Sequence, residues 1–206
     1  MAFGFLDVAV TPAVHKVQEE LGVAHIWENF NGDRKFDRFT ENEAIFISGR
    51  DSFYIATSSE TGWPYVQHRG GSKGFLKVLN DQTLAFADYR GNKQYISVGN
   101  LSVNSKVCLF LMDYHHRTRL KIYAYAQAVS LDANLELAKI VLEGINGKPE
   151  RIIRLDLKAF DWNCPQHIVP RFTQGEIEKT LRPMHICLER LAAENAELRI
   201  SIDQRK

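Results

Sequence analysis

The apolar positions between residues 43 and 161 recur in short runs that are typical of β-strands. The first two runs are Ile45–Ile47 and Phe53–Thr57, and turn-forming residues then lead to a strand that starts at Pro64 and runs to His68. Five further runs cover Phe75–Leu79, Thr83–Asp88, Lys106–Met112, Leu120–Val129 and Arg151–Asp161. Six or seven short strands among these eight runs, with glycine turns and few intervening helices, predict a mainly β fold, a closed or nearly closed antiparallel barrel with flanking helices.

Helical patterns stand before, within and after these runs. Thr11 can cap a first helix in which Pro12 takes the first position, and Gly22 ends it. The pattern favours a short helix over Lys93–Val98 and another that Asn134 caps and that runs through Glu143. The sequence therefore predicts a barrel with helices at its N-terminus and between strands.

The C-terminal segment has the apolar spacing of a coiled coil. Apolar residues and one asparagine alternate at intervals of three and four, at Leu181, Met184, Leu188, Leu191, Asn195, Leu198 and Ile202. We expect Pro183 to limit how far the helix extends upstream. The stripe favours pairing with the same helix of a second copy over packing across the barrel.

These patterns divide the chain into three parts. Residues 1–42 form an N-terminal helix and connection, residues 43–172 the barrel, and residues 173–206 a C-terminal helical extension. No internal repeat interrupts this order. At 206 residues the chain can bury a sizeable core.

Charge and cysteine content narrow the functional classes. Lys and Arg number 26 against 25 acidic residues, so a net charge of +1 does not indicate a nucleic-acid or membrane partner, and an anion site has to be local. Three widely spaced cysteines are typical of a reducing cytoplasm rather than a disulfide framework. The first ten residues lack the basic start of a signal peptide, so we expect a cytoplasmic protein.

Two glycine-containing loops carry the candidate chemistry. Residues 62–74 and 83–94 each combine a short strand with glycines, a cation and small polar donors. Glycine lets the backbone approach a ligand closely, and loop N–H groups beside a Lys or Arg suit a phosphate. The alternative is two hairpin turns whose charges are solvated.

The order of these motifs resembles the FMN-binding split-barrel family of the pyridoxamine 5′-phosphate oxidases, especially its flavin-nucleotide-binding branch. The resemblance covers roughly residues 43–171. Its motifs are Gly62-x-Pro64-Tyr65, Arg69-Gly70-Gly71, Phe86-x-Asp88, Gly91-Asn92-Lys93, Asn104-Ser105-Lys106-Val107 and the stretch from Asn163 to Ile168. It implies a homodimer that builds each FMN site from both subunits.

The resemblance also implies cofactor contacts at particular positions. Residues along the flavin ring and ribityl chain would be Gln67, His68, Arg69 and Gly70, and those at the ribityl phosphate would be Ala87, Asp88, Asn92, Lys93 and Gln94. Arg119 would reach the flavin from the partner subunit. Trp162 and Arg171 would complete the pocket.

The sequence departs from the oxidases where their specificity lies. Their C-terminal Arg-x-His-Asp-Arg motif is replaced by Cys164–Arg171. We therefore expect a flavin-dependent oxidoreductase that acts on a small organic molecule other than the vitamin B6 phosphates. His167 is the candidate proton donor, and the alternative is a histidine that only shapes the pocket or has a structural role. Cys164 and His167 are a weak metal pattern without a second pair, so no metal is expected.

Two other functions remain open. The chain could bind flavin without turnover, as a carrier or redox sensor, or it could handle haem through His115 or His167. No Gly-x-Gly-x-x-Gly motif follows a strand, so any nicotinamide donor would bind without a Rossmann domain.

Overall fold

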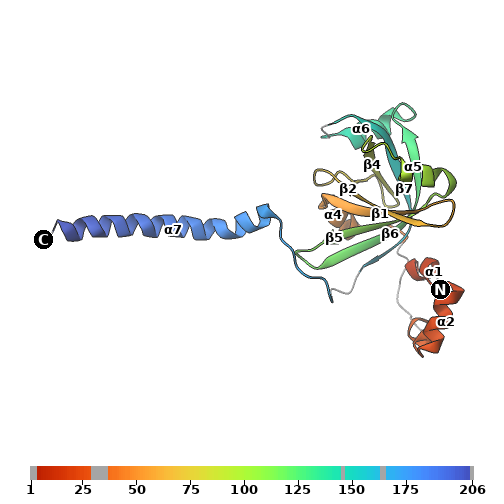
Figure 1. The fold of residues 1–206 in the computed structure, drawn as a ribbon, viewed down its shortest axis with the longest axis horizontal. Coiled ribbons are helices and arrows are strands. Elements are labelled where there is room, and N and C mark those ends of the chain that lie inside the picture. The colour runs from red at the N-terminus through yellow and green to blue at the C-terminus, as the bar shows by residue number, and fades with distance from the viewer. Residues whose placement is uncertain (1–3, 29–36, 145–146, 163–165, 205–206) are drawn as a thin grey trace. The chain divides into compact units, whose positions relative to one another are not determined.

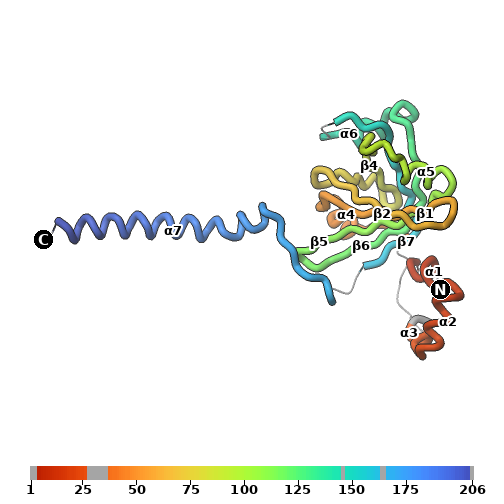
Figure 2. Tube along the Cα trace, viewed as in Figure 1, coloured from red at the N-terminus to blue at the C-terminus, as the bar shows by residue number. Residues whose placement is uncertain are grey.

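The structure is a computed structural model that describes residues 4–28, 37–144, 147–162 and 166–204. The chain forms two compact units. The larger unit covers residues 1–113 and 118–166, and the smaller covers residues 114–117 and 167–206. Figures 1 and 2 show the elements of each unit.

One antiparallel sheet of seven strands forms the larger unit (Figure 1). Its strands lie in the order β2-β1-β5-β6-β7-β4-β3. They are β1 (Ser52–Ser58), β2 (Pro64–Gly70), β3 (Lys77–Val78), β4 (Thr83–Tyr89), β5 (Lys106–Asp113), β6 (Thr118–Ser130) and β7 (Pro149–Trp162). The predicted antiparallel barrel with flanking helices is confirmed.

The core lies on the concave side of this sheet. Phe53, Phe86 and Phe160 are each at most 2% exposed, and aliphatic residues of β5, β6 and β7 surround them. Strand β4 is buried on both faces, because Leu84 and Phe86 enter this core while Ala85 and Ala87 pack in a second cluster with α6 (Leu135–Leu142). Asn134 caps α6 through its side chain, as the sequence predicts.

The barrel is not closed by a backbone ladder. Strands β2 and β4 form no backbone pairs among the described residues, yet their side chains meet: Arg69 Nη1 lies 3.1 Å from Asp88 Oδ1. Helix α5 (Ile96–Val103) adds two further links to this side of the barrel. Its Ser97 hydroxyl bonds Gln67 Oε1 at 2.8 Å, and its Asn100 amide donates to Thr57 Oγ1 at 2.8 Å. Polar side chains therefore bridge the split between β2 and β4.

One predicted strand is a helix in the structure. Residues 45–47, expected as a strand, belong to α4 (Glu41–Ser48). A three-residue apolar run cannot distinguish helix from strand, and a capping box between Thr40 and Glu43 starts a helix here. The predicted helix at Pro12 is confirmed as α2 (Pro12–Glu20), whereas α5 begins at Ile96, after the expected start. Helices α1 (Phe5–Ala9) and α3 (Ala24–Glu28) were not predicted.

The smaller unit consists of the β5–β6 hairpin tip and helix α7 (Gln174–Asp203), shown as a trace in Figure 2. A capping box between Thr173 and Glu176 starts α7, and the helix continues through Pro183. The expectation that Pro183 limits the helix upstream is wrong, because a capping box fixes the start at Gln174, nine residues before the proline, and the helix continues through it. The tip packs against the entry to α7, with His115 edge-on to Phe172 and Arg171 over the Tyr114 ring.

A search of the described helices found none with both the length and the apolar character needed to cross a bilayer.

Glu43 offers a test of how α4 is fixed to the barrel. Its carboxylate accepts hydrogen bonds from the Thr40 amide, the Thr40 hydroxyl and the Trp162 indole N–H, at 2.8, 2.6 and 2.7 Å. Burial by itself raises the pKa of Glu43, but these hydrogen bonds outweigh burial and leave the pKa below its usual value. The stabilisation that they give is therefore complete above the unfolded-state pKa of about 4.3 and is lost as pH falls through the lower folded-state value.

We predict that Glu43→Gln lowers the free energy of unfolding by about 1–3 kcal/mol at neutral pH, because buried donors lose a charged acceptor. The difference from wild type should shrink as the pH falls below about 4. Urea unfolding at a series of pH values measures both effects. The matched control is Glu41→Gln, an exposed change in the same first turn. Equal losses for the two variants, or a pH-independent difference, would contradict the role of Glu43.

Candidate functional site

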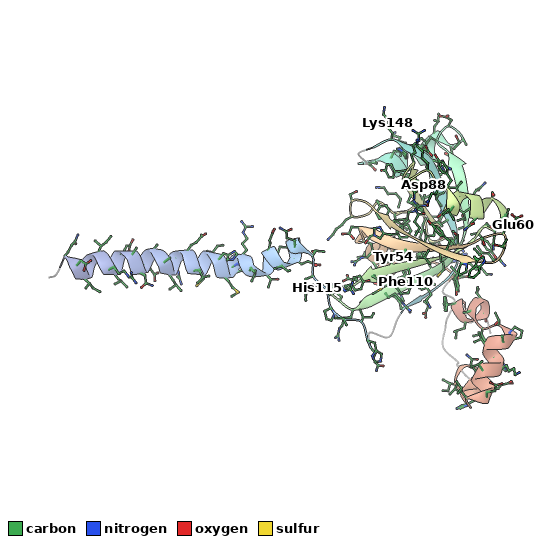
Figure 3. The ribbon with its side chains drawn as sticks, in the orientation of Figure 1. Tyr54, Glu60, Asp88, Phe110, His115 and Lys148 are labelled. Carbon is green, nitrogen blue, oxygen red and sulfur yellow. The ribbon has the colours of Figure 1, made fainter. Side chains whose placement is uncertain are left out.

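A small cleft opens where β2, β4 and the start of α5 meet. It encloses about 40 Å³, room for about one water molecule, so a larger ligand would have to extend over its mouth. Asp88, labelled in Figure 3, lies in its wall. The lining residues are Tyr65, Gln67, Arg69, Asp88, Tyr89, Arg90, Gly91, Asn92, Gln94, Tyr95, Ile96, Ser97 and Val98.

A buried carboxylate organises the cations of the cleft. Asp88 is 4% exposed and contacts two guanidinium groups, Arg69 Nη1 at 3.1 Å and Arg151 Nε at 3.6 Å. Burial raises the pKa of Asp88, and the attraction of Arg69 and Arg151 lowers it by less, so the pKa stays above its ordinary value. The Asp88 carboxylate therefore fixes the positions of two arginines, although burial makes its ionised form less favourable than in water.

A second carboxylate, Glu150, fixes the outer rim. It pairs with Arg90 Nε at 3.2 Å and with the neighbouring Arg151, and it accepts the Tyr95 hydroxyl at 3.2 Å. Arg151 also lies over the Tyr95 ring, 5.1 Å from its centre. The charges of Glu150 and Arg151 cancel. The cleft wall then holds two cations, Arg69 and Arg90, and one anion, Asp88, so its net charge is positive.

The loop between β4 and α5 adopts an unusual backbone. Gly91, Lys93 and Tyr95 have φ values of 53°, 62° and 53°, so left-handed residues alternate with ordinary ones. Asn92 fixes this shape, because its side chain accepts the Gln94 amide N–H and donates to the Gln94 side chain. Left-handed backbone at residues other than glycine costs roughly 1–2 kcal/mol each, and such strained residues cluster at ligand-binding and active sites.

Helix α5 starts inside the cleft. Its first residues, Ile96, Ser97 and Val98, line the cavity, and its N-cap residue Tyr95 gives no side-chain cap within the described chain. The first N–H groups of a helix lack intrahelical partners and carry partial positive charge. An uncapped helix start beside two arginines suits an anion such as a phosphate.

The structure brings together five of the site residues that the resemblance implied. Gln67, Arg69, Asp88, Asn92 and Gln94 all line the cleft. Gln67 and Arg69 come from β2, whereas Asp88, Asn92 and Gln94 come from the end of β4 and the loop after it, so the structure places parts of both segments at one cleft.

Two other implied residues do not line the cleft. Lys93 is exposed in the same loop without lining the cavity, and Gly70 is exposed at the end of β2. Lys93 therefore adds positive charge near the mouth of the cleft.

Two neighbouring implied residues face other surroundings. Ala87 is buried in the cluster beneath α6, so only its backbone could take part in binding. His68 lies on the outer face of β2, where its ring meets Tyr54 edge-on at 5.5 Å.

Arg119 and Trp162 lie at the opposite end of β7 from Arg151. Arg119 pairs with Asp161 at 3.1 Å and lies over the Phe110 ring, and Trp162 donates to Glu43. In the ladder of β7, Trp162 pairs with Leu120 and Arg151 pairs with Asp88. Trp162 and Arg151 are eleven residues apart along β7, which is roughly 35 Å of extended strand. These side chains and the cleft therefore belong to two separate regions of one chain.

The remaining candidates belong to the smaller unit or fall outside the described residues. Arg171 is exposed and lies over the Tyr114 ring at 4.9 Å, and His167 is exposed with a φ of 66°. Cys164 lies outside the described residues. Among the described residues, no three His, Cys, Asp or Glu side chains form a group that could hold a metal ion.

Sequence reasoning missed Arg90, Glu150 and Arg151. Arg90 stands inside the glycine-containing loop and could have been included with its neighbours. Arg151 and Glu150 reach the cleft only because Asp88 pairs with Arg151 across β4 and β7, and no local pattern in the sequence indicates this register.

Comparisons with known proteins give the family. A family model described as pyridoxamine 5′-phosphate oxidase matches residues 39–160. HupZ from Group A Streptococcus is similar in structure, with 16% identity and a TM-score of 0.51, and the match covers 65% of this chain and 99% of HupZ. At this identity the similarity shows the fold alone. No curated protein matches the chain.

Two other solved structures have lower scores. An FMN-binding protein from Syntrophomonas wolfei has 14% identity and a TM-score of 0.43, over 74% of this chain and 95% of its own. HutZ, the heme storage protein from Vibrio cholerae, has 17% identity and a TM-score of 0.43, over 61% of this chain and 94% of its own.

We predict a pH dependence that isolates Asp88. Because its folded-state pKa is raised, the ionised carboxylate costs stability above that value, and the cost disappears as pH falls towards the unfolded-state pKa of about 3.9. As the pH is lowered from 7 to about 4, the unfolding free energy of wild type should therefore rise relative to that of Asp88→Asn.

Denaturant unfolding of both proteins across this range measures the shift. Asp81→Asn is the control, since Asp81 is an exposed carboxylate paired with Arg38 away from the cleft. A difference that stays constant with pH, or that moves against wild type on acidification, would show that burial does not dominate at Asp88.

Proposed function

Because the chain belongs to the pyridoxamine 5′-phosphate oxidase family, we propose that it is an FMN-binding flavoprotein that oxidises or reduces a small organic molecule. The flavin, when bound, supplies the hydride or electron transfer. The chain supplies binding, orientation and electrostatics. It acts as a relative of the oxidases with a different substrate, because the C-terminal motif that gives them their specificity is absent from its sequence.

One observation carries this proposal: the uncapped start of α5 opens into the same cleft as Arg69 and Arg90. The helix N-terminus and the two guanidinium groups together offer donors and positive charge to a phosphate dianion. Lys93 stands beside them in a loop with left-handed backbone. The cleft itself is too small for a flavin ring, so the phosphate end would bind here and the ring would extend across the surface.

The separation along β7 supports sites shared between two subunits. Arg119 and Trp162 lie far from the cleft within one chain, yet the resemblance assigns both to the flavin pocket. A homodimer resolves this, since one subunit can bring its Arg119 to the cleft of the other.

The outer face of β1 and β5 is suited to such contact. It carries exposed aromatic residues, Tyr54 at 42% and Phe110 at 36%, on neighbouring strands (Figure 3). Large exposed apolar side chains that adjoin one another often mark a protein interface.

Each residue of the proposed site has a separate role. Arg69 and Arg90 hold the phosphate, Gln67 orients the ribityl chain through its fixed link to Ser97, and Arg119 places positive charge near the flavin ring. Positive charge there stabilises the anionic reduced cofactor. Asp161 pairs with Arg119 and limits its movement.

We predict that the cationic loop discriminates FMN from riboflavin. Wild type should bind FMN more tightly than riboflavin, because only FMN presents a phosphate to the cations. The double variant Arg90→Met with Lys93→Met should lose about 1.5–3 kcal/mol of FMN affinity, the scale of a charge-assisted bond, and little riboflavin affinity. Titration of the apoprotein with each flavin, followed by fluorescence quenching, measures the two affinities.

The control is Lys139→Met, an exposed lysine on α6, which should leave both affinities unchanged. If the FMN-to-riboflavin ratio were the same in wild type and the double variant, the phosphate would not bind at this loop. If neither flavin bound, the flavoprotein proposal would be overturned, and absorption of the purified protein would then show whether it holds haem.

A second prediction separates a catalyst from a carrier. If the protein turns over, NADH, NADPH or a small organic donor should bleach the visible absorbance of the bound flavin under anaerobic conditions, and oxygen or an organic acceptor should restore it. Stopped-flow absorbance measures the rates of both steps. Flavin that is retained tightly but reduced no faster than free FMN would favour the carrier or sensor.

A further inference from the structure

Helix α7 carries an apolar stripe that the rest of its own compact unit leaves exposed. None of its 30 residues, all of them described, is buried. Leu188 and Leu198 are each 61% exposed, and Met184 and Ile202 are 59% and 57% exposed. A helix of this length with so much exposed apolar surface is typical of one half of an interface.

The stripe has heptad spacing from Ile177 to Ile202. The a positions are Leu181, Leu188, Asn195 and Ile202, and the d positions are Ile177, Met184, Leu191 and Leu198. We propose that α7 pairs with α7 of a second copy of this chain as a parallel, in-register, two-stranded coiled coil. The proposal does not depend on the flavin, because it concerns only α7.

Asn195 decides the orientation. In a parallel pair, Asn195 meets Asn195 of the second copy, so the two amides can bond each other inside the seam. In the antiparallel pair that keeps the whole stripe in contact, a positions face d positions, and Asn195 would lie opposite Met184. The amide would then lose contact with water and gain no polar partner, since its one bond is to the Leu191 carbonyl of its own helix. The single polar a position therefore favours the parallel, in-register pair.

The charges beside the seam agree with this register. Glu194 occupies a g position and Arg199 the following e position, the two places that face each other across a parallel coiled coil. Two-fold symmetry repeats this pair, which gives two ion pairs around the asparagine layer. Within one helix Glu194 has only a weak partner, Arg190 at 3.9 Å.

Pro183 is compatible with the seam. It takes a c position, on the outer side of the helix, so its ring does not enter the interface. The first turn of α7 is fixed by its capping box and by the hairpin tip, where Phe172 packs against His115. The helix therefore has a fixed start and an apolar stripe that is exposed along its remaining length.

Site-specific disulfide crosslinking of the full chain tests the pairing. Cys187→Ser gives the parent, into which Leu188→Cys places a thiol at an a position. In a parallel coil the two a-position Cα atoms are about 6 Å apart, within disulfide range. Oxidation should then convert most of the protein to a covalent dimer, seen on a non-reducing gel. Ala193→Cys, at the outward f position, is the matched control and should give roughly tenfold less dimer.

Mixing the Leu188→Cys protein with Leu191→Cys protein tests the antiparallel alternative, since only that arrangement brings positions 188 and 191 together. Heterodimers in this mixture would overturn the parallel orientation. If Leu188→Cys crosslinked no more than the parent while the protein remained dimeric in sedimentation, the two copies would pair through the barrel alone and the coiled coil would be overturned. Each variant's circular dichroism spectrum is compared with that of the parent, so that loss of α7 helix would be seen directly.

Discussion

The ion pair between Arg69 and Asp88 links β2 to β4, two strands that share no backbone ladder in the part of the chain that the structure describes. A sheet that closed fully between β2 and β4 would leave no opening, and a sheet without side-chain links would be free to open there. The chain has an intermediate arrangement, in which Arg69, Asp88 and the polar contacts of α5 span the split. The same charges that link β2 to β4 also line the cleft, so stability and the proposed ligand binding would draw on one set of residues.

Much of the fold could be read from the sequence because it follows local rules. Runs of apolar residues gave the main strands, and the capping residues Thr11 and Asn134 gave two helices. The failures have equally local causes. The run at residues 45–47 was too short to show a period, and the capping box at Thr40 was the better signal. Pro183 was given more weight than the capping box at Thr173, which lies ten residues upstream and starts a helix that continues through the proline.

The candidate site was less predictable, because its geometry depends on register. The glycine-containing loops indicated Arg69, Asp88 and Asn92 directly. No spacing along the chain shows that Arg151 pairs with Asp88 across two strands, or that Trp162 is engaged with Glu43. The resemblance to a family grouped residues that one chain keeps apart, and the homodimer proposed above would bring them together.

The left-handed backbone at Lys93 limits how this loop can change during evolution. Glycine would relax the backbone there at once, but it would remove the cation, whereas a β-branched residue would keep neither the charge nor the conformation. A substitution at position 93 can therefore remove the backbone strain or keep the positive charge, but not both. A lineage that retains lysine there keeps a strained residue whose conformational cost the surrounding loop, held by the hydrogen bonds between Asn92 and Gln94, has to offset.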